Sequence, residues 1–140
     1  MEEEKLQLPK TPPKRKKKIW GEEGFTAKIH YGAYDYTVKF IKEDKIRKFV
    51  GQDEENIRVF GGINCYGQEI LVSCETTEQT KKATVLHELV HAILLRNGTS
   101  VDEDDKDTQN VTSEELVDSM ALGMYELMRR NPELVRWLMK

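Results

Sequence analysis

The segment His87-Glu88-Leu89-Val90-His91 contains the residues of this chain that could do chemistry together. On a helix, positions i and i+4 lie on one face, so His87 and His91 would direct both imidazoles at a single point. Neutral imidazole nitrogens are good zinc ligands. Glu88 is turned by about 100° from His87, so it would lie beside a metal and could accept a proton from a water molecule. The motif therefore predicts a zinc-dependent hydrolytic site with Glu88 as general base.

A third ligand must come from outside this motif, because a catalytic zinc has three protein ligands and one open position. The remaining histidine, His30, lies in a predicted strand, where ordinary hydrogen bonds are the simpler role. A later predicted helix offers Glu114, Glu115 and Asp118. Glu114 shares a face with the apolar stripe of that helix, and a carboxylate on a core face needs a partner such as a metal. Glu115 lies on a more exposed face.

Glu114 is therefore the predicted third zinc ligand, although the helix dipole alone also favours an exposed acid in a first turn. Glu115 stays open as the alternative ligand. Asp118 follows Glu114 by about one turn, and we expect its carboxylate to accept the second N–H of a ligand histidine and so fix the tautomer.

Two helices must position these side chains, and both have clear end signals. The first runs from a threonine cap at 76 or 77 to the Asn-Gly pair at 97–98. Its apolar residues occur almost all round, which predicts a buried helix. The second follows a cap at 112 or 113 and runs to about Arg130, and Pro132 then starts a short terminal helix.

Strands precede these helices. Apolar and polar residues alternate over residues 27–31 and 34–40, and residues 69–74 also resemble a strand. The segment 57–60 precedes two glycines. Gly32 and Ala33 leave open a hairpin or one bent strand. The polar stretch 42–55 is ambiguous between a short helix and a loop, and the acidic stretch 99–109 predicts a loop. The predicted fold class is α+β: a small, mostly antiparallel sheet packed on the helix that carries the histidines.

The first 18 residues differ in composition from the rest of the chain. They carry a net charge of +4, whereas the remaining residues sum to −7. They also hold three of the four prolines, so we expect a disordered basic tail over 1–18 and one folded domain over 19–140. Contact of residues 10–18 with nucleic acid or an acidic partner is one role for the tail. A solubilising leader is the alternative, favoured because no aromatic residues interleave with the charges.

Composition excludes several protein classes. Two cysteines are too few for a disulfide scaffold or a cysteine-based zinc cluster. No apolar stretch approaches the roughly 18 residues of a membrane span, and no secretory leader pattern follows Met1. We therefore expect a reducing, cytoplasmic location, with both cysteines as free thiols.

Residues 84–94 and 114–123 resemble small phage-type zinc metallopeptidases of the ImmA/IrrE-like group. Those proteins carry HExxH on one helix and a glutamate ligand on the next, in the arrangement E-x-x-x-[N/D]-x-x-A, which Glu114, Asp118 and Ala121 match. The segment 131–134 is typical of a phage-encoded subset. The resemblance implies a zincin-like fold and host cytoplasm as the compartment, and the strand at 69–74 would lie at the cleft edge. No helix-turn-helix module is visible.

These observations predict a zinc metallopeptidase whose substrate is a protein or peptide, in line with family members that cleave regulatory proteins. The alternative is a catalytically idle, zinc-stabilised binding module that contacts protein or nucleic acid through its basic tail. Glu88 disfavours that alternative, since a purely structural site needs no general base. A metal-free, DNA-associated accessory protein with a chance motif is a second alternative, which zinc content would exclude.

Overall fold

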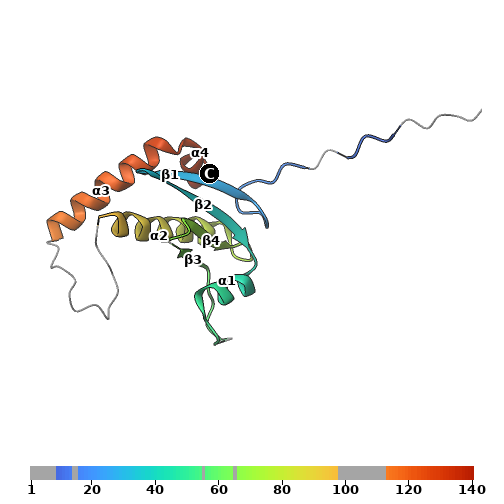
Figure 1. Ribbon diagram of the computed structural model, residues 1–140, viewed down its shortest axis with the longest axis horizontal. Helices are drawn as coiled ribbons and strands as arrows, with labels where there is room; N and C mark the ends of the chain where they lie inside the picture. The colour runs from blue at the N-terminus through green and yellow to red at the C-terminus, as the bar shows by residue number, and fades with distance from the viewer. Residues whose placement is uncertain (1–8, 14–15, 55, 65, 98–112) are drawn as a thin grey trace, which may run out of the picture.

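The computed structural model describes residues 9–13, 16–54, 56–64, 66–97 and 113–140. The described residues form an α+β structure with a four-stranded sheet and four helices (Figure 1). The elements in chain order are β1 (Thr26–Tyr31), β2 (Tyr34–Ile41), α1 (Glu43–Val50), β3 (Gly61–Asn64), β4 (Glu69–Ser73), α2 (Glu78–Arg96), α3 (Ser113–Arg130) and α4 (Pro132–Leu138).

The sheet is mixed, with strand order β1-β2-β4-β3. β1 and β2 form an antiparallel hairpin, in which Gly32 has φ +62° in the tight connection. β3 and β4 are also antiparallel, but β2 and β4 are parallel. The expected mostly antiparallel sheet is thus confirmed for two of its three pairings. The central pairing is parallel because α1 and β3 connect β2 to β4.

The hydrophobic core lies between α2 and one face of the sheet. Val85, Leu89, Ala92 and Ile93 of α2 are fully buried. They belong to the same cluster as alternate residues of the strands, namely Ile29, Tyr31, Tyr36, Val38, Phe40, Ile70 and Val72. Buried residues recur at every second position in the strands and at every third or fourth position in the helix. This is the pattern expected when a helix covers one face of a sheet.

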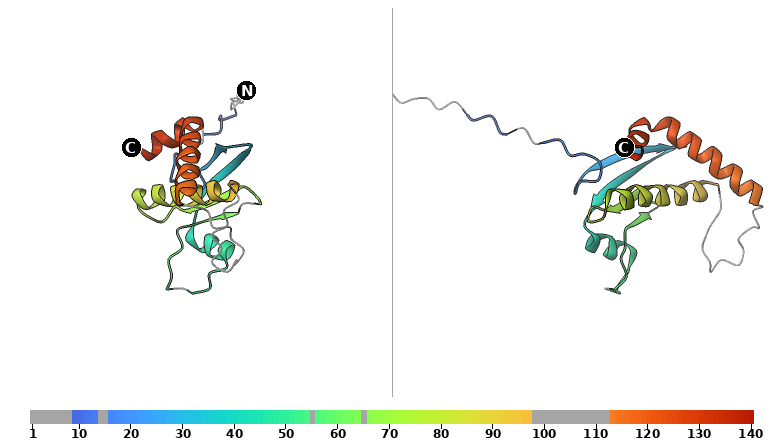
Figure 2. Two further views of the ribbon diagram at one scale, coloured as in Figure 1. Left: turned by 90° about the vertical axis from the view of Figure 1, so that its left-hand side faces the viewer. Right: turned by 180° about the vertical axis from the view of Figure 1, so that it is seen from behind.

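Helix α1 lies on the opposite side of β3 from α2 (Figure 2). Consecutive residues of β3, which face opposite sides of the strand, show this: a side chain at Gly61 would meet Thr84 of α2, whereas a side chain at Gly62 would meet Val50 and Phe49 of α1. The ambiguous stretch 42–55 therefore contains a short helix, buried through Ile46.

Helices α3 and α4 close the other side of the core. Asn131 joins them to the sheet: its side chain accepts from His30 N at 2.8 Å and donates to His30 O at 2.7 Å. Leu134 and Trp137 of α4 are buried. Pro132 begins α4 as expected.

The two main helices begin where the sequence predicts, but β3 does not. Thr77 caps α2 by accepting from Thr80 N at 3.2 Å, and α2 ends at Arg96 before a cap at Asn97. The segment 57–60 is not a strand: β3 begins at Gly61 and pairs with β4. The acidic stretch 99–109 lies outside the described residues.

Removal of residues 1–18 should leave the fold intact. Residues 9–13 and 16–18 are exposed and belong to no helix or strand, and the others of this segment lie outside the described residues. Truncation therefore removes little buried apolar area. Thermal denaturation of the full chain and of a chain starting at Ile19 should give the same melting temperature; a clear drop would show that the tail packs on the body.

Candidate metal centre

His87 and His91 lie one turn apart on α2 and their rings converge. Their Nε2 atoms are 3.2 Å apart, and the ring planes are inclined by 76°. Two imidazole nitrogens bound to a tetrahedral zinc, each at about 2.0–2.1 Å, would lie about 3.3–3.4 Å apart. Both side chains are exposed, so an ion can reach them from solvent. The pair therefore fits two adjacent positions of a zinc site.

Glu88 lies beside this pair but is buried, with only 6% of the residue exposed. At about 100° per residue, Glu88 falls between the arc of α2 that faces the core and the arc that carries the histidines. Burial raises the pKa of the Glu88 carboxyl, and the nearby His87 partly opposes this shift. Partial desolvation of its exposed ring, where it packs on α2, lowers the pKa of His91, and the charge of His87 lowers it further. The neutral imidazole that a metal requires is thereby favoured.

A cavity of about 490 Å³ opens next to Glu88 and His87. The N-terminal half of α2 forms one wall through Thr80 and Thr84, and residues 58–61 form the opposite wall. Gly61 allows this close approach, since a Cβ there would lie 2.5 Å from Thr84 Cγ2 and 3.4 Å from Glu88 Oε1. Glu88, the candidate general base, therefore lines an open cavity.

Glu43 holds the opposite wall in place. Its carboxylate accepts from Val59 N at 2.9 Å and from Arg58 Nε at 3.0 Å, and Arg47 lies at 3.4 Å. Burial alone would raise the pKa of Glu43, but these donors more than offset it and the pKa is lowered. Sequence reasoning missed this residue, because its partners Arg58 and Val59 are 15 and 16 residues away in the chain and meet it only in the fold.

The structure does not bring Glu114 and Asp118 to the histidines. Within the described ranges, no group of three or more His, Cys, Asp or Glu residues could hold a metal ion. Both side chains are exposed in the first turns of α3, and Val117 on the predicted core stripe is 60% exposed. The predicted burial of Glu114 is therefore wrong. The physical reason is that the first turns of α3 lie beyond the C-terminal end of α2 (Figure 1).

His30 has the ordinary role that its strand position indicates. Its Nδ1 lies 2.5 Å from Asp35 Oδ1 across the β1–β2 hairpin. His30 therefore contacts Asp35 in β1, and His87 and His91 are the two histidines whose rings face each other.

Comparison of the chain with protein-family models, with curated proteins and with solved structures finds no match. The geometry around His87, Glu88 and His91 therefore carries the functional argument, together with the motif itself. Among the described residues, no helix combines the length and apolar character that a bilayer crossing requires.

Gly61→Ala should disturb the site from the β3 side. The new Cβ would meet Thr84 Cγ2 at 2.5 Å and the Leu71 carbonyl oxygen at 2.9 Å, so we expect a loss of about 1–3 kcal/mol in the free energy of unfolding, as for an overpacked core. Denaturant unfolding of Gly61→Ala, Thr84→Ser and the double variant tests this contact. Thr84→Ser removes the clashing methyl but keeps the hydroxyl that donates to Thr80 O, so the double variant should recover part of the loss. Additive losses would contradict the proposed clash.

Glu43→Gln should destabilise the protein at neutral pH by about 1.5–3 kcal/mol, because it weakens hydrogen bonds to a charged group. The folded-state pKa of Glu43 is lowered from the ordinary value of 4.5. Its contribution is therefore complete above 4.5 and is lost as the pH falls through the folded-state value. The difference in unfolding free energy between wild type and variant should shrink over that acidic range. Asp44→Asn, an exposed acid of the same turn, is the control, and an equal effect there would contradict the assignment.

Proposed function

We propose that this protein is a zinc-dependent metallopeptidase that hydrolyses a peptide bond in a protein or peptide substrate. The observation that carries the proposal is the 3.2 Å separation of the two Nε2 atoms beside a buried carboxylate that faces an open cavity. The same proposal includes a zincin-like fold and membership of the ImmA/IrrE-like group.

His87 and His91 would hold the zinc. Bound zinc lowers the pKa of a water molecule to about 7 and polarises a carbonyl group. Glu88 accepts the proton of the attacking water and returns it to the leaving amine. In the metal-free protein, burial raises the pKa of this carboxyl.

Glu114 is the proposed third ligand, with Asp118 as its neighbour that orients a ligand histidine. Glu114 lies on α3 and is exposed, so its ligation requires the first turns of α3 to lie closer to α2 when zinc is bound. The alternative, an idle zinc-binding module, would follow if zinc bound without any cleavage activity.

The substrate would lie along β3. This strand is the sheet edge beside α2, since β4 is paired on both sides. Strand 69–74 is the cleft edge expected from the sequence, but β4 has no free edge, and we propose β3 for that role instead. An extended peptide can add to an exposed edge through main-chain hydrogen bonds, and the start of β3 at Gly61 borders Glu88.

The Glu88→Gln variant tests the reaction. It keeps the shape of the side chain and removes the proton acceptor, so it should retain zinc and lose peptide cleavage by about 10²–10⁴-fold. His91→Ala should lose zinc and activity together. Metal analysis and a peptide-library cleavage assay, both on the full chain, provide the two readouts. Full activity in Glu88→Gln, or a wild-type chain that takes up no zinc, would contradict the proposal.

Glu114→Gln tests the third ligand. It should weaken zinc affinity, whereas Glu133→Gln, an exposed first-turn acid of α4, should not. Competition with a zinc chelator measures both affinities. Loss of affinity in Glu115→Gln but not in Glu114→Gln would assign the ligand to Glu115, and unchanged affinity in both variants would exclude both glutamates as ligands.

A further inference from the structure

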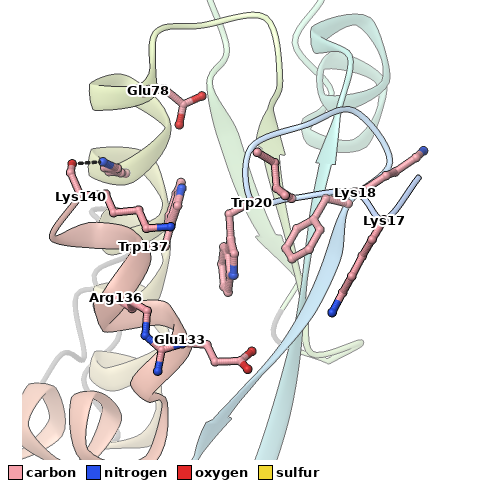
Figure 3. Close-up of a pocket in the computed structure, with 11 residues that line it drawn as sticks. Lys17, Lys18, Trp20, Glu78, Glu133, Arg136, Trp137 and Lys140 are labelled. Atoms are coloured by element: carbon pink, nitrogen blue, oxygen red, sulfur yellow. Dashed lines mark hydrogen bonds between the residues drawn. The ribbon is translucent and has the colours of Figure 1, made fainter. Parts of the chain in front are cut away.

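A second cavity, of about 780 Å³, lies between residues 17–25, the first turns of α2 and helix α4 with the C-terminal residue. Its size falls within the range of about 300–1,000 Å³ that ligand pockets occupy. Figure 3 shows Trp20 beside Trp137, with Lys17 and Lys18 on one side and Arg136 and Lys140 on the other. We call this feature the tryptophan groove.

Aromatic rings form the floor of the tryptophan groove. Trp20 and Trp137 stack with ring centroids 5.0 Å apart and planes inclined by 21°, and Phe25 lies 5.2 Å from Trp20. Trp137 is buried, whereas Trp20 and Phe25 are partly exposed. Trp137 therefore anchors the aromatic floor to the core, and the exposed parts of Trp20 and Phe25 are what a ligand can contact.

Cations surround this floor. Lys17, Lys18, Lys82, Arg136 and Lys140 line the groove, against the two acids Glu78 and Glu133. Glu78 is already paired with Lys81 at 3.0 Å, and Lys82 lies over the Trp137 ring and donates to Lys140 O at 2.8 Å. Lys17, Lys18 and Arg136 are therefore the cations on which the proposal rests. The excess of positive charge is local, because the chain after residue 18 has a net charge of −7. An anionic ligand is therefore the complement of this groove.

We propose that the tryptophan groove binds single-stranded nucleic acid, with bases packed against the exposed parts of Trp20 and Phe25 and phosphates paired with Lys17, Lys18 and Arg136. Proteins that bind single strands combine such a basic track with aromatic stacking platforms. Lys17 and Lys18 end the run of five basic residues 14–18, so the positive charge extends along the chain, as an extended polyanion requires. The tail itself has no aromatic residues among its charges, but the fold brings Trp137 from the other end of the chain to Trp20.

Stacking and charge pairing tolerate any base sequence, and they predict strong salt dependence. The groove is separate from the residues of the proposed zinc site, since the two cavities share no lining residue. Binding of nucleic acid should therefore be unchanged in Glu88→Gln, whatever the outcome for cleavage.

Intrinsic fluorescence reports directly on this groove, because it contains both tryptophans of the chain. We expect titration of the full-length protein with an oligothymidylate of about ten nucleotides, within the usual site size, to quench the fluorescence. An abasic oligomer of equal length is the matched ligand. It should bind about tenfold or more weakly, since each stacked base contributes about 1–3 kcal/mol. Equal binding of the abasic oligomer, or no quenching by the oligothymidylate, would overturn the proposal.

Variants that remove positive charges test the proposed contacts with phosphates. Lys17, Lys18 and Arg136 are exposed, so their replacement by Gln should not affect folding. Lys17→Gln/Lys18→Gln should reduce the slope of log affinity against log salt by about 0.7 for each phosphate that the protein no longer neutralises, and Arg136→Gln should weaken binding further. Lys45→Gln/Lys48→Gln, two exposed lysines of α1, is the matched control. Equal effects of both pairs, or binding of phosphatidylserine vesicles in place of the oligonucleotide, would overturn the assignment.

Discussion

Burial of one stripe of α2 against the sheet fixes the direction of every other side chain on that helix. Val85, Leu89 and Ile93 are fully buried, and each contributes about 1.5–3 kcal/mol relative to an exposed position. With that stripe fixed, helical geometry turns His87 and His91 away from the core and leaves Glu88 at the border between the two faces. The proposed chemistry depends on this border, because Glu88 is buried, which raises the pKa of its carboxyl, and still lines a cavity.

Two glycines set how closely other elements approach α2. Gly61 brings the start of β3 next to Thr84 and Glu88. Gly123 does the same for α3, since a Cβ there would lie 2.7 Å from Ile93 Cγ2. Because α3 crosses α2 near the C-terminal end of α2, its first turns pass beyond that helix (Figure 1). The same packing that buries Leu127 therefore leaves Glu114 exposed.

Local signals in the sequence predicted the elements well, and long-range packing explains what they missed. The Thr77 cap, the Pro132 start and the i, i+4 spacing of the histidines are local features, and the structure confirms each of them. The parallel pairing of β2 with β4 joins segments that meet only in the fold. The same is true of the hydrogen bond that Glu43 accepts from Val59 N. The predicted burial of Glu114 failed because periodicity identifies a face of a helix but not how far a neighbour covers it.

X-ray absorption at the zinc edge would show whether His87 and His91 hold zinc beside Glu88. Imidazole and carboxylate ligands lie at about 2.0–2.2 Å from zinc, whereas thiolate sulfur lies at about 2.3 Å. For the zinc-loaded full chain, we expect a first shell of nitrogen and oxygen only, with the outer-shell scattering of two imidazoles. His91→Ala should remove one of these imidazoles. A sulfur shell, or an imidazole count that does not change in His91→Ala, would contradict zinc binding by this histidine pair.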